Sequence, residues 1–168
     1  WIRGFGWDQG SLEECKNDPS MFPRRSDIDP VSPDNPVILT DFSGHTILVN
    51  HKALEMAGIT SDTEPPSGVI ERDAEGEATG IFLELGAQAL ITKFVPILTR
   101  EEKKEALLSA IGLLSANGIT SFTDAAIGPG GEAYAYGVMS AEFIDIYREL
   151  LDGGQLAARA TILILLGD

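Results

Sequence analysis

The chain has 168 residues, 43% of them hydrophobic, and a formal net charge of −14 at pH 7. This length and apolar content allow a real hydrophobic core. So acidic a chain is a poor partner for nucleic acid or anionic membranes, which bind clustered lysine and arginine. No apolar run is long enough to span a bilayer, so we expect a soluble, cytoplasmic protein. The single cysteine, Cys15, excludes an internal disulfide and is interpreted as an incidental surface thiol.

The first third of the chain centres on a Ser-Gly-His turn, Ser43 to His45, that follows a strand-like apolar run. Residues 1–36 are predicted to be irregular, with one short helix near residues 11–16, because prolines and glycines interrupt them throughout. Residues 37–39 are predicted as a short buried strand that leads into the turn. This order places an imidazole at the mouth of a strand-to-helix loop, where α/β proteins keep their chemistry.

Beyond this turn the sequence predicts a helix, a hairpin and a second helix. Asn50 is expected to cap a helix that continues to Met56, and Gly58 to end it in the left-handed conformation. Residues 68–80 are predicted as a glycine-rich hairpin around an Asp-Ala-Glu-Gly turn. Residues 81–95 are predicted as a helix with one apolar side that stops before a proline.

From Thr99 onward the predicted order is helix, strand, helix, strand. Thr99 and Glu102 form a capping box for a helix that continues to residue 116. The elements expected after it are a strand at residues 119–123, a helix at 140–151 capped by Ser140, and a strand at 157–166. Each strand is short, apolar and without alternation, as in a parallel sheet covered on both faces, so the predicted fold class is α/β.

Several short motifs occur in the order and spacing of one enzyme family. They are Trp-Ile-Arg-Gly-Phe-Gly-Trp-Asp at residues 1–8, the Ser-Gly-His turn followed by Val-Asn, Ala-Leu and Ala-Gly-Ile, Glu84 in Gly-Ile-Phe-Leu-Glu, and Asn-Gly-Ile-Thr-Ser at 117–121 with Asp124. The chain thereby resembles the amidohydrolase 3 family, the YtcJ-like and N-substituted formamide deformylase-like group of metal-dependent amidohydrolases. Ser43 stands where this family usually has aspartate, so the turn lacks the charge of that carboxylate.

The resemblance implies a (β/α)8 TIM barrel, which takes about 250 residues. Three strands of the barrel type are expected here, beginning at Val37, Ile119 and Ala157. We therefore interpret the α/β chain as an internal fragment, a partial (β/α)8 TIM barrel with an inserted β-hairpin and helix subdomain. Residues 1–98 would hold the N-terminal barrel segment and the insertion, and residues 99–168 the βα repeats of the barrel.

Amidohydrolases that resemble this family bind one or two divalent metals through a His-x-His motif and further side chains, with zinc the expected ion. This chain has two histidines, His45 and His51, and they do not form that motif. We therefore expect the metal in a longer parent, no stoichiometric metal on this chain, and no activity of this chain alone. Glu84 is the one candidate ligand, since a carboxylate in apolar surroundings needs a partner such as Arg72, a metal or water.

Five residues are candidates for substrate binding, and no catalytic residue is assigned. His45 and Gly44 at the turn would hydrogen-bond a substrate carbonyl, although a histidine there would equally cap the loop. Trp7 and Asp8 come from a glycine-flanked loop and either line a pocket or pack structurally. Asp124 is expected at the C-terminal end of a barrel strand, where catalytic groups of such barrels lie, or as a cap for the next loop.

Two functions stay open at this point. The first is a fragment of a metal-dependent amidohydrolase that acts on a non-peptide C–N bond (amide, formamide or cyclic amide), with metal-activated water as the nucleophile in the parent. The alternative is a non-catalytic binding or interaction module on the same scaffold, which Ser43 and the missing ligands would permit. The expected partner of the parent is a small amide-type substrate. Because three strands cannot close a barrel, the open strand edges predict a homodimer or small oligomer of the chain.

Overall fold

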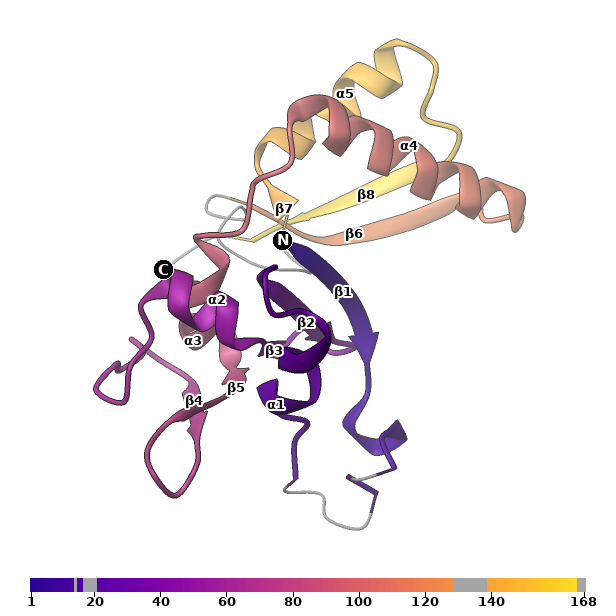
Figure 1. Ribbon diagram of the computed structural model, residues 1–168. Helices are drawn as coiled ribbons and strands as arrows, with labels where there is room; N and C mark the ends of the chain where they lie inside the picture. The colour runs from indigo at the N-terminus through magenta and orange to yellow at the C-terminus, as the bar shows by residue number, and fades with distance from the viewer. Residues whose placement is uncertain (14, 17–20, 129–138, 166–168) are drawn as a thin grey trace. The chain divides into compact units, whose positions relative to one another are not determined.

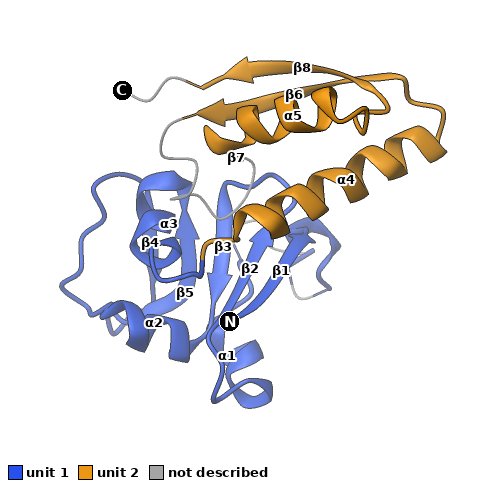
Figure 2. Cartoon of the chain, turned by 90° about the horizontal axis from the view of Figure 1, so that it is seen from above, with its two compact units in different colours: residues 1–96 blue, residues 97–168 orange. Residues whose placement is uncertain are grey.

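A computed structural model of the chain describes residues 1–13, 15–16, 21–128 and 139–165. They form two compact units, unit 1 (Trp1–Pro96) and unit 2 (Ile97–Asp168), drawn in blue and orange in Figure 2. Each unit combines helices with a sheet of its own, so the fold is mixed α/β (Figure 1). Within the described residues, no helix is both long and apolar enough to cross a membrane.

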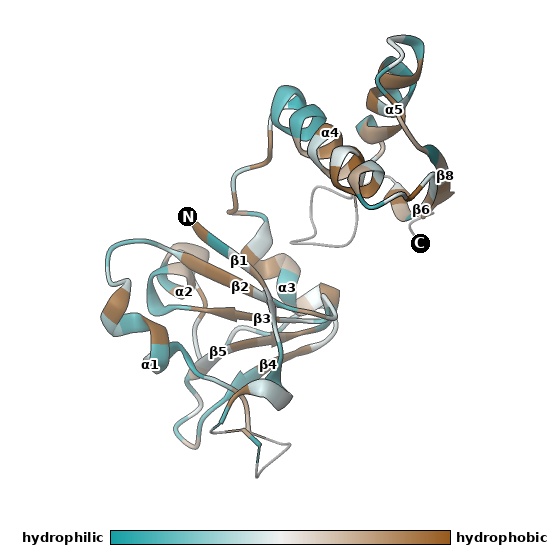
Figure 3. Cartoon of the chain, turned by 90° about the vertical axis from the view of Figure 1, so that its right-hand side faces the viewer, coloured by the Kyte–Doolittle hydropathy of each residue, from teal (hydrophilic) through white to brown (hydrophobic). Residues whose placement is uncertain are grey.

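Unit 1 is built on a five-stranded sheet of order β1-β2-β3-β5-β4. Its strands are β1 (Ile2–Trp7), β2 (Val37–Asp41), β3 (Thr46–Val49), β4 (Val69–Arg72) and β5 (Ala78–Leu83). β1 pairs with β2 in parallel, and the other neighbouring strands pair in antiparallel fashion. Apolar residues follow the strands (Figure 3), and β3 is buried along its whole length.

Two parts of this sheet correct the predictions from sequence. β1 lies inside the segment predicted to be irregular, because Ile2 pairs with Val37 and the ladder to β2 stabilises a strand that glycines alone would disfavour. The Ser-Gly-His turn joins β2 to β3 as a hairpin, so the predicted strand-to-helix loop is wrong. The sheet around β2 is therefore mixed, whereas the strand from Val37 was predicted to be of the parallel barrel type.

The helices of unit 1 are α1 (Arg25–Ile28), α2 (His51–Ala57) and α3 (Glu84–Thr92), with 3-10 turns at Gln9–Ser11 and Asp29–Val31. The capping prediction for α2 is confirmed: Ala53 N donates to the Asn50 side chain over 3.1 Å, and Gly58 has a φ of 66°. The predicted hairpin of β4 and β5 is also confirmed. α2 and α3 lie against each other, and α3 contacts β3, β4 and β5.

Two further predictions for unit 1 are wrong. The helix predicted from residue 81 begins at Glu84, because Ile81 and Phe82 pair with β3 and are completely buried in the sheet. Cys15, predicted at the surface, is 3% exposed and belongs to the core. The polar neighbours of this cysteine in sequence say little about where its own side chain packs.

Unit 2 contains α4 (Arg100–Ala116), β6 (Ser121–Gly128), β7 (Met139–Ser140), α5 (Glu142–Asp152) and β8 (Arg159–Ile164). The sheet order is β7-β6-β8 with both pairings parallel, so the predicted helix-strand-helix-strand order is confirmed. The capping box of Thr99 and Glu102 at the start of α4 is confirmed as well. Both helices pack on one face of the sheet through a shared apolar core, which includes Leu107, Ile111, Phe143, Ile146, Leu150 and, from the strands, Phe122 and Ile162.

Two positions in unit 2 differ from the predictions. Asp124 lies in the middle of β6, because the strand continues to Gly128, and not at its C-terminal end. Ser140 ends β7, and Ala141 takes the position before α5 without a side-chain cap. Residue 166, the last of the predicted final strand, lies outside the described residues.

Candidate functional site

Several of the predicted site residues meet at one end of the unit 1 sheet. β1 ends at Trp7 directly beside Asp41, the last residue of β2. On the other side of the turn, Thr46 at the start of β3 pairs with Leu83 at the end of β5. The Ser-Gly-His turn and Glu84, the residue after β5, therefore share this end of the sheet with Trp7.

A network of short hydrogen bonds holds the Ser-Gly-His turn. The carboxylate of Asp41, which is 9% exposed, accepts from Ser43 Oγ over 2.7 Å and from Thr46 N over 3.0 Å. Ser43 Oγ in turn accepts from His45 N over 3.1 Å. Gly44 has a φ of 79°, a conformation that favours glycine. The hydroxyl of Ser43 thus links the buried charge of Asp41 to the backbone of His45.

A buried glutamine fixes the same turn from α3. The side chain of Gln88 is 2% exposed, and its Nε2 donates to the carbonyl oxygen of Gly44 over 3.1 Å. Leaving a buried amide without a partner costs about 1–3 kcal/mol. Gln88 therefore couples the position of the turn to the position of α3, which begins at Glu84.

Glu84 stands at a sharp bend where β5 passes directly into α3. Its φ is 68°, the one positive φ among the described residues other than glycine. A side chain in this conformation costs about 1–3 kcal/mol and persists where the surroundings hold it, often at functional sites. Here the backbone N of Glu84 donates to the carbonyl oxygen of His45 over 2.8 Å. The bend and the turn are therefore joined through backbone as well as side chains.

The side chains of His45 and Glu84 form an exposed ion pair. His45 Nδ1 lies 2.9 Å from Glu84 Oε2, and the two side chains are 64% and 60% exposed. The hydrogen bond to Glu84 raises the pKa of His45, and the charges of Glu84 and Asp41 raise it further. A carboxylate only accepts, so Nδ1 carries a proton; Nε2 then accepts in the neutral ring and donates in the charged one. This arrangement suits contact with a polar group of a ligand.

The polar atoms of Trp7 and Asp8 are engaged within the chain. Trp7 Nε1 donates to the carbonyl oxygen of Leu39 over 3.0 Å. Asp8 caps the following 3-10 turn, where its carboxylate accepts from Gly10 N over 3.0 Å and from Ser11 Oγ over 2.8 Å. These contacts place both residues at the end of β1 beside the turn and account for their geometry without a ligand.

Asp124 belongs to unit 2, where it contacts α5. Its Oδ2 accepts from the hydroxyl of Tyr147 on α5 over 2.8 Å. Burial raises the pKa of Tyr147 well above its ordinary value, and the hydrogen bond to Asp124 raises it further. Tyr147 therefore stays a neutral donor at physiological pH.

Sequence reasoning named His45 and Glu84 separately and did not pair them. It offered Arg72 as a partner for Glu84, but Arg72 donates to the carbonyl oxygens of Gly76 and Thr63. Asp41 and Gln88 were missed because each reads as an ordinary polar residue within a strand or helix. Only the antiparallel pairing of β3 with β5 shows that Asp41 and Gln88 meet the His45–Glu84 pair at the turn.

The described residues do not make a complete metal site. No group of three or more histidine, cysteine, aspartate or glutamate side chains converges in the part of the chain that the structure describes. His45 and Glu84 supply two donors, whereas protein zinc sites use at least three protein ligands. The hydrogen bond to His45 gives the Glu84 carboxylate the partner that it needs, and the role of Glu84 as a metal ligand stays a prediction.

Known proteins resemble the chain over half of its length or more. YtcJ of Bacillus subtilis, which is named as an amidohydrolase, is 34% identical over 165 residues, 98% of this chain and 29% of that protein. The N-substituted formamide deformylase of Arthrobacter pascens is 40% identical over 91 residues, 54% of this chain and 16% of that protein. The chain thus spans less than a third of the length of these relatives.

A solved structure and a family model both match nearly the whole chain. A crystal structure of an uncharacterized metal-dependent hydrolase from Pyrococcus furiosus matches 97% of this chain and 28% of its own, with 25% identity and a TM-score of 0.52. The model of the amidohydrolase family matches residues 1–167. These matches support a hydrolase scaffold, and they confirm the resemblance inferred from the motifs. The chain belongs to the amidohydrolase family.

Proposed function

We propose that the chain is part of a metal-dependent amidohydrolase that cleaves a non-peptide C–N bond in an amide, formamide or cyclic amide. The observation that carries the proposal is the exposed His45–Glu84 pair, held on a strained bend at the end of a sheet in a chain of this family. Strained, well-supported backbone of this kind clusters at functional sites. The name of the deformylase relative supports the C–N substrate class.

His45 is the residue that we assign to the substrate carbonyl, with Gly44 beside it. Glu84 holds Nδ1, so the ring has a defined orientation and presents Nε2 for a second hydrogen bond. When protonated, Nε2 donates to a carbonyl oxygen, and the raised pKa of His45 extends the pH range of this form. The roles of Trp7, Asp8 and Asp124 in substrate binding stay predictions.

A divalent metal belongs to the proposal as a cofactor of the whole protein. The metal-dependent hydrolase among the structural relatives supports it. The chemistry that such an ion supplies is activation of water and polarisation of a carbonyl. Its full ligand set would involve side chains other than the described ones, because these offer two donors at the turn.

The proposed setting is a (β/α)8 barrel, with residues 1–98 as barrel segment and insertion and residues 99–168 as βα repeats. The parallel pair β6 and β8, joined through α5 on one face, is the unit from which such barrels are built. The mixed sheet of unit 1 fits the inserted part of this scheme.

The test is a substrate panel on the full protein that contains this chain, loaded with zinc. N-substituted formamides, simple amides and cyclic amides are compared with esters and phosphate esters. We expect hydrolysis within the C–N group, and in the His45→Ala variant a fall in kcat/KM of at least about tenfold, roughly 1.4 kcal/mol. The thermal midpoint should hardly change, because the side chain is exposed.

His51→Ala is the matched control, since His51 lies at the start of α2 and contacts Arg25 outside the turn. It should keep the kcat/KM of the unchanged protein. Full activity of His45→Ala would show that the pair does not contact the substrate. Binding of the same amides without any hydrolysis would favour the alternative, a non-catalytic binding module, which rests on the incomplete ligand set.

A further inference from the structure

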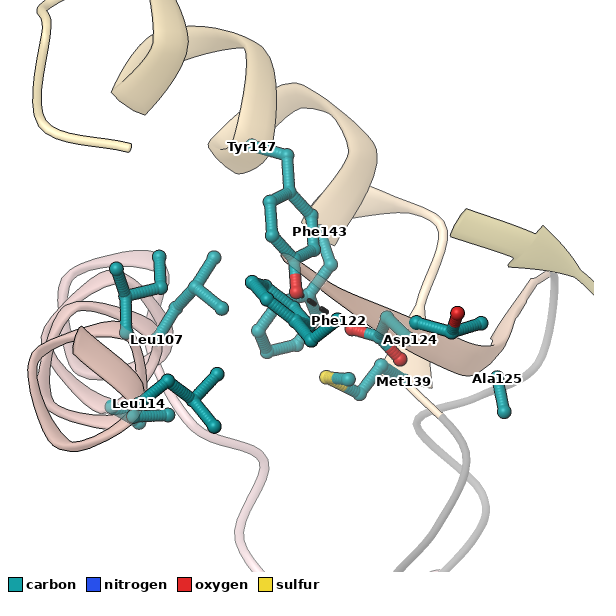
Figure 4. Close-up of a pocket in the computed structure, with 12 residues that line it drawn as sticks. Leu107, Leu114, Phe122, Asp124, Ala125, Met139, Phe143 and Tyr147 are labelled. Atoms are coloured by element: carbon teal, nitrogen blue, oxygen red, sulfur yellow. Dashed lines mark hydrogen bonds between the residues drawn. The ribbon is translucent and has the colours of Figure 1, made fainter. Parts of the chain in front are cut away.

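Unit 2 contains a cavity that the proposed role of the His45–Glu84 pair does not explain. It has a volume of about 330 Å³, lies between α4, α5 and β6, and is open to solvent where its lining residues Ala106, Ala110, Thr123 and Ala125 are exposed. Figure 4 shows its walls, which include Leu107, Leu114, Phe122, Asp124, Phe143 and Tyr147. Ligand pockets in proteins range from about 300 to 1,000 Å³ and are mostly apolar with a few polar groups. This space, hereafter the unit 2 cavity, has the size for a small monocyclic molecule.

The polar groups of the unit 2 cavity come from two facing elements. Asp124 on β6 accepts from the hydroxyl of Tyr147 on α5, and both groups line the cavity (Figure 4). That hydrogen bond uses Oδ2 of Asp124, and this carboxylate has no further hydrogen-bond partner among the described residues. Tyr147 is 4% exposed, and burial raises its pKa, so it remains a neutral donor. The carboxylate thus retains oxygen lone pairs for a second donor.

The charge of the unit 2 cavity is not balanced by a cation of the lining. Among the described residues that line it, Asp124 alone carries a charge. The basic residues of α4 are used elsewhere: Lys103 pairs with Glu142 over 2.7 Å, and Arg100 and Lys104 pair with Glu149. Asp124 is half-buried, and a carboxylate partly removed from water beside apolar walls is stabilised by a charged partner. A ligand that brings its own positive charge would supply this pairing.

We propose that the unit 2 cavity binds a small apolar molecule that carries a protonated amine. The ammonium group donates to Asp124, while the ring or alkyl part packs on Leu107, Leu114 and Phe122. A charge-assisted hydrogen bond of N⁺–H to a carboxylate is about twice as strong as a neutral one. Burial of the apolar part removes apolar surface from water and adds to the affinity. The proposal is independent of the His45–Glu84 pair, because all the lining residues belong to unit 2.

The experiment compares two probes of nearly equal shape, phenethylamine and phenethyl alcohol, at neutral pH. Binding to the purified protein is measured by ligand-observed NMR and by chemical shifts of the lining residues. We expect the amine to bind at least about tenfold more tightly than the alcohol, which corresponds to 1.4 kcal/mol. Shifts should appear for Ala110 and Phe122, which line the cavity.

Two variants and one control decide the outcome. Asp124→Asn keeps the shape but removes the charge, so the preference for the amine should disappear. Asp145→Asn, on the exposed side of α5 with a side chain 69% exposed, is the matched control and should retain it. Ala110→Phe fills the cavity and should abolish binding of both probes even if Asp124→Asn does not fold. Equal affinity of the two probes, no binding, or an unchanged preference in Asp124→Asn or Ala110→Phe would overturn the proposal.

Discussion

The two units place their polar groups in opposite settings. In unit 1 the His45–Glu84 pair is exposed, and a direct hydrogen bond is the main cause of the raised pKa of His45. In unit 2 the partner of Asp124 is Tyr147, whose pKa is raised chiefly by burial. An exposed pair meets a ligand at the surface, whereas the half-buried Asp124 beside the buried Tyr147 would select a ligand by size and charge. The difference is the reason why we propose a separate ligand for each unit.

The units also differ in how their elements approach each other. Unit 1 relies on glycines: a Cβ on Gly86 would lie 2.0 Å from Ser67 Oγ, and one on Gly68 would lie 2.2 Å from the carbonyl oxygen of Leu83. Unit 2 has a close glycine contact as well, since a Cβ on Gly128 would lie 2.0 Å from the carbonyl oxygen of Leu165, and it adds an apolar core under α4 and α5 and ion pairs between the two helices. Substitution of these close-packed glycines should therefore damage either unit, and truncation of large buried side chains should damage unit 2 through its core.

The largest expected effect is a core truncation in unit 2. Ile146 on α5 is completely buried, so Ile146→Ala should lower the free energy of unfolding by about 2–5 kcal/mol. Leu151 on the same helix is 62% exposed, and Leu151→Ala should change the free energy of unfolding by less than about 0.5 kcal/mol. Urea unfolding followed by circular dichroism measures both. Similar losses in the two variants would show that α5 does not pack as described.

The next largest effect is expected from substituting a closely packed glycine, compared with a glycine that has free space. Gly86→Ala places its Cβ against Ser67, including Ser67 O at 2.8 Å, and should cost about 1–3 kcal/mol. Gly112 is an exposed residue of α4 with nothing within 4 Å of the added Cβ, so Gly112→Ala should stabilise the chain by about 0.5–1 kcal/mol. Thermal and urea unfolding measure whether each of the two variants is less or more stable than the unchanged chain. A stabilising Gly86→Ala would contradict the close approach of α3 to Ser67.

Elements with local signals could be predicted from sequence. The capping box of Thr99 and Glu102 and the cap at Asn50 depend on residues within one helical turn, and both are present. Elements that depend on distant pairing could not. β1 exists because Ile2 meets Val37, and the start of α3 at Glu84 depends on the ladder between β5 and β3.

The candidate site likewise combines one residue with a local signal and partners that distant pairing brings to it. His45 is conspicuous in the sequence because a histidine after glycine at a turn suggests exposure, and it is indeed exposed. Its partner Glu84 and the supports Asp41 and Gln88 come from other elements, and only the order of strands in the sheet joins them. The position of Asp124 was misjudged because the strand was predicted to end at residue 123. No residue that breaks a strand lies there, and β6 continues to Gly128.

A smaller effect concerns the titration of His45. The hydrogen bond and charge of Glu84 raise its pKa, so Glu84→Gln should lower it toward the ordinary value, while Glu71→Gln should leave it raised. The folded state favours the protonated ring. The stabilisation from the pair is therefore present below the pKa of histidine in the unfolded chain, and it is lost as the pH rises through the raised folded-state pKa. NMR titration of the His45 ring measures the shift, and an unchanged pKa in Glu84→Gln would contradict the pair.

The smallest expected effect is on metal content. His45 and Glu84 offer two donors, and no third side chain of the types that bind metals joins them among the described residues. Two exposed donors bind zinc weakly, because each further ligand adds affinity and excludes water. The chain, treated with chelator, reloaded with zinc and desalted, should therefore keep far less than one zinc per chain by elemental analysis. His45→Ala should leave that value unchanged. Close to one zinc per chain, lost in His45→Ala and Glu84→Gln, would instead make the pair part of a complete metal site and would assign Glu84 as a ligand.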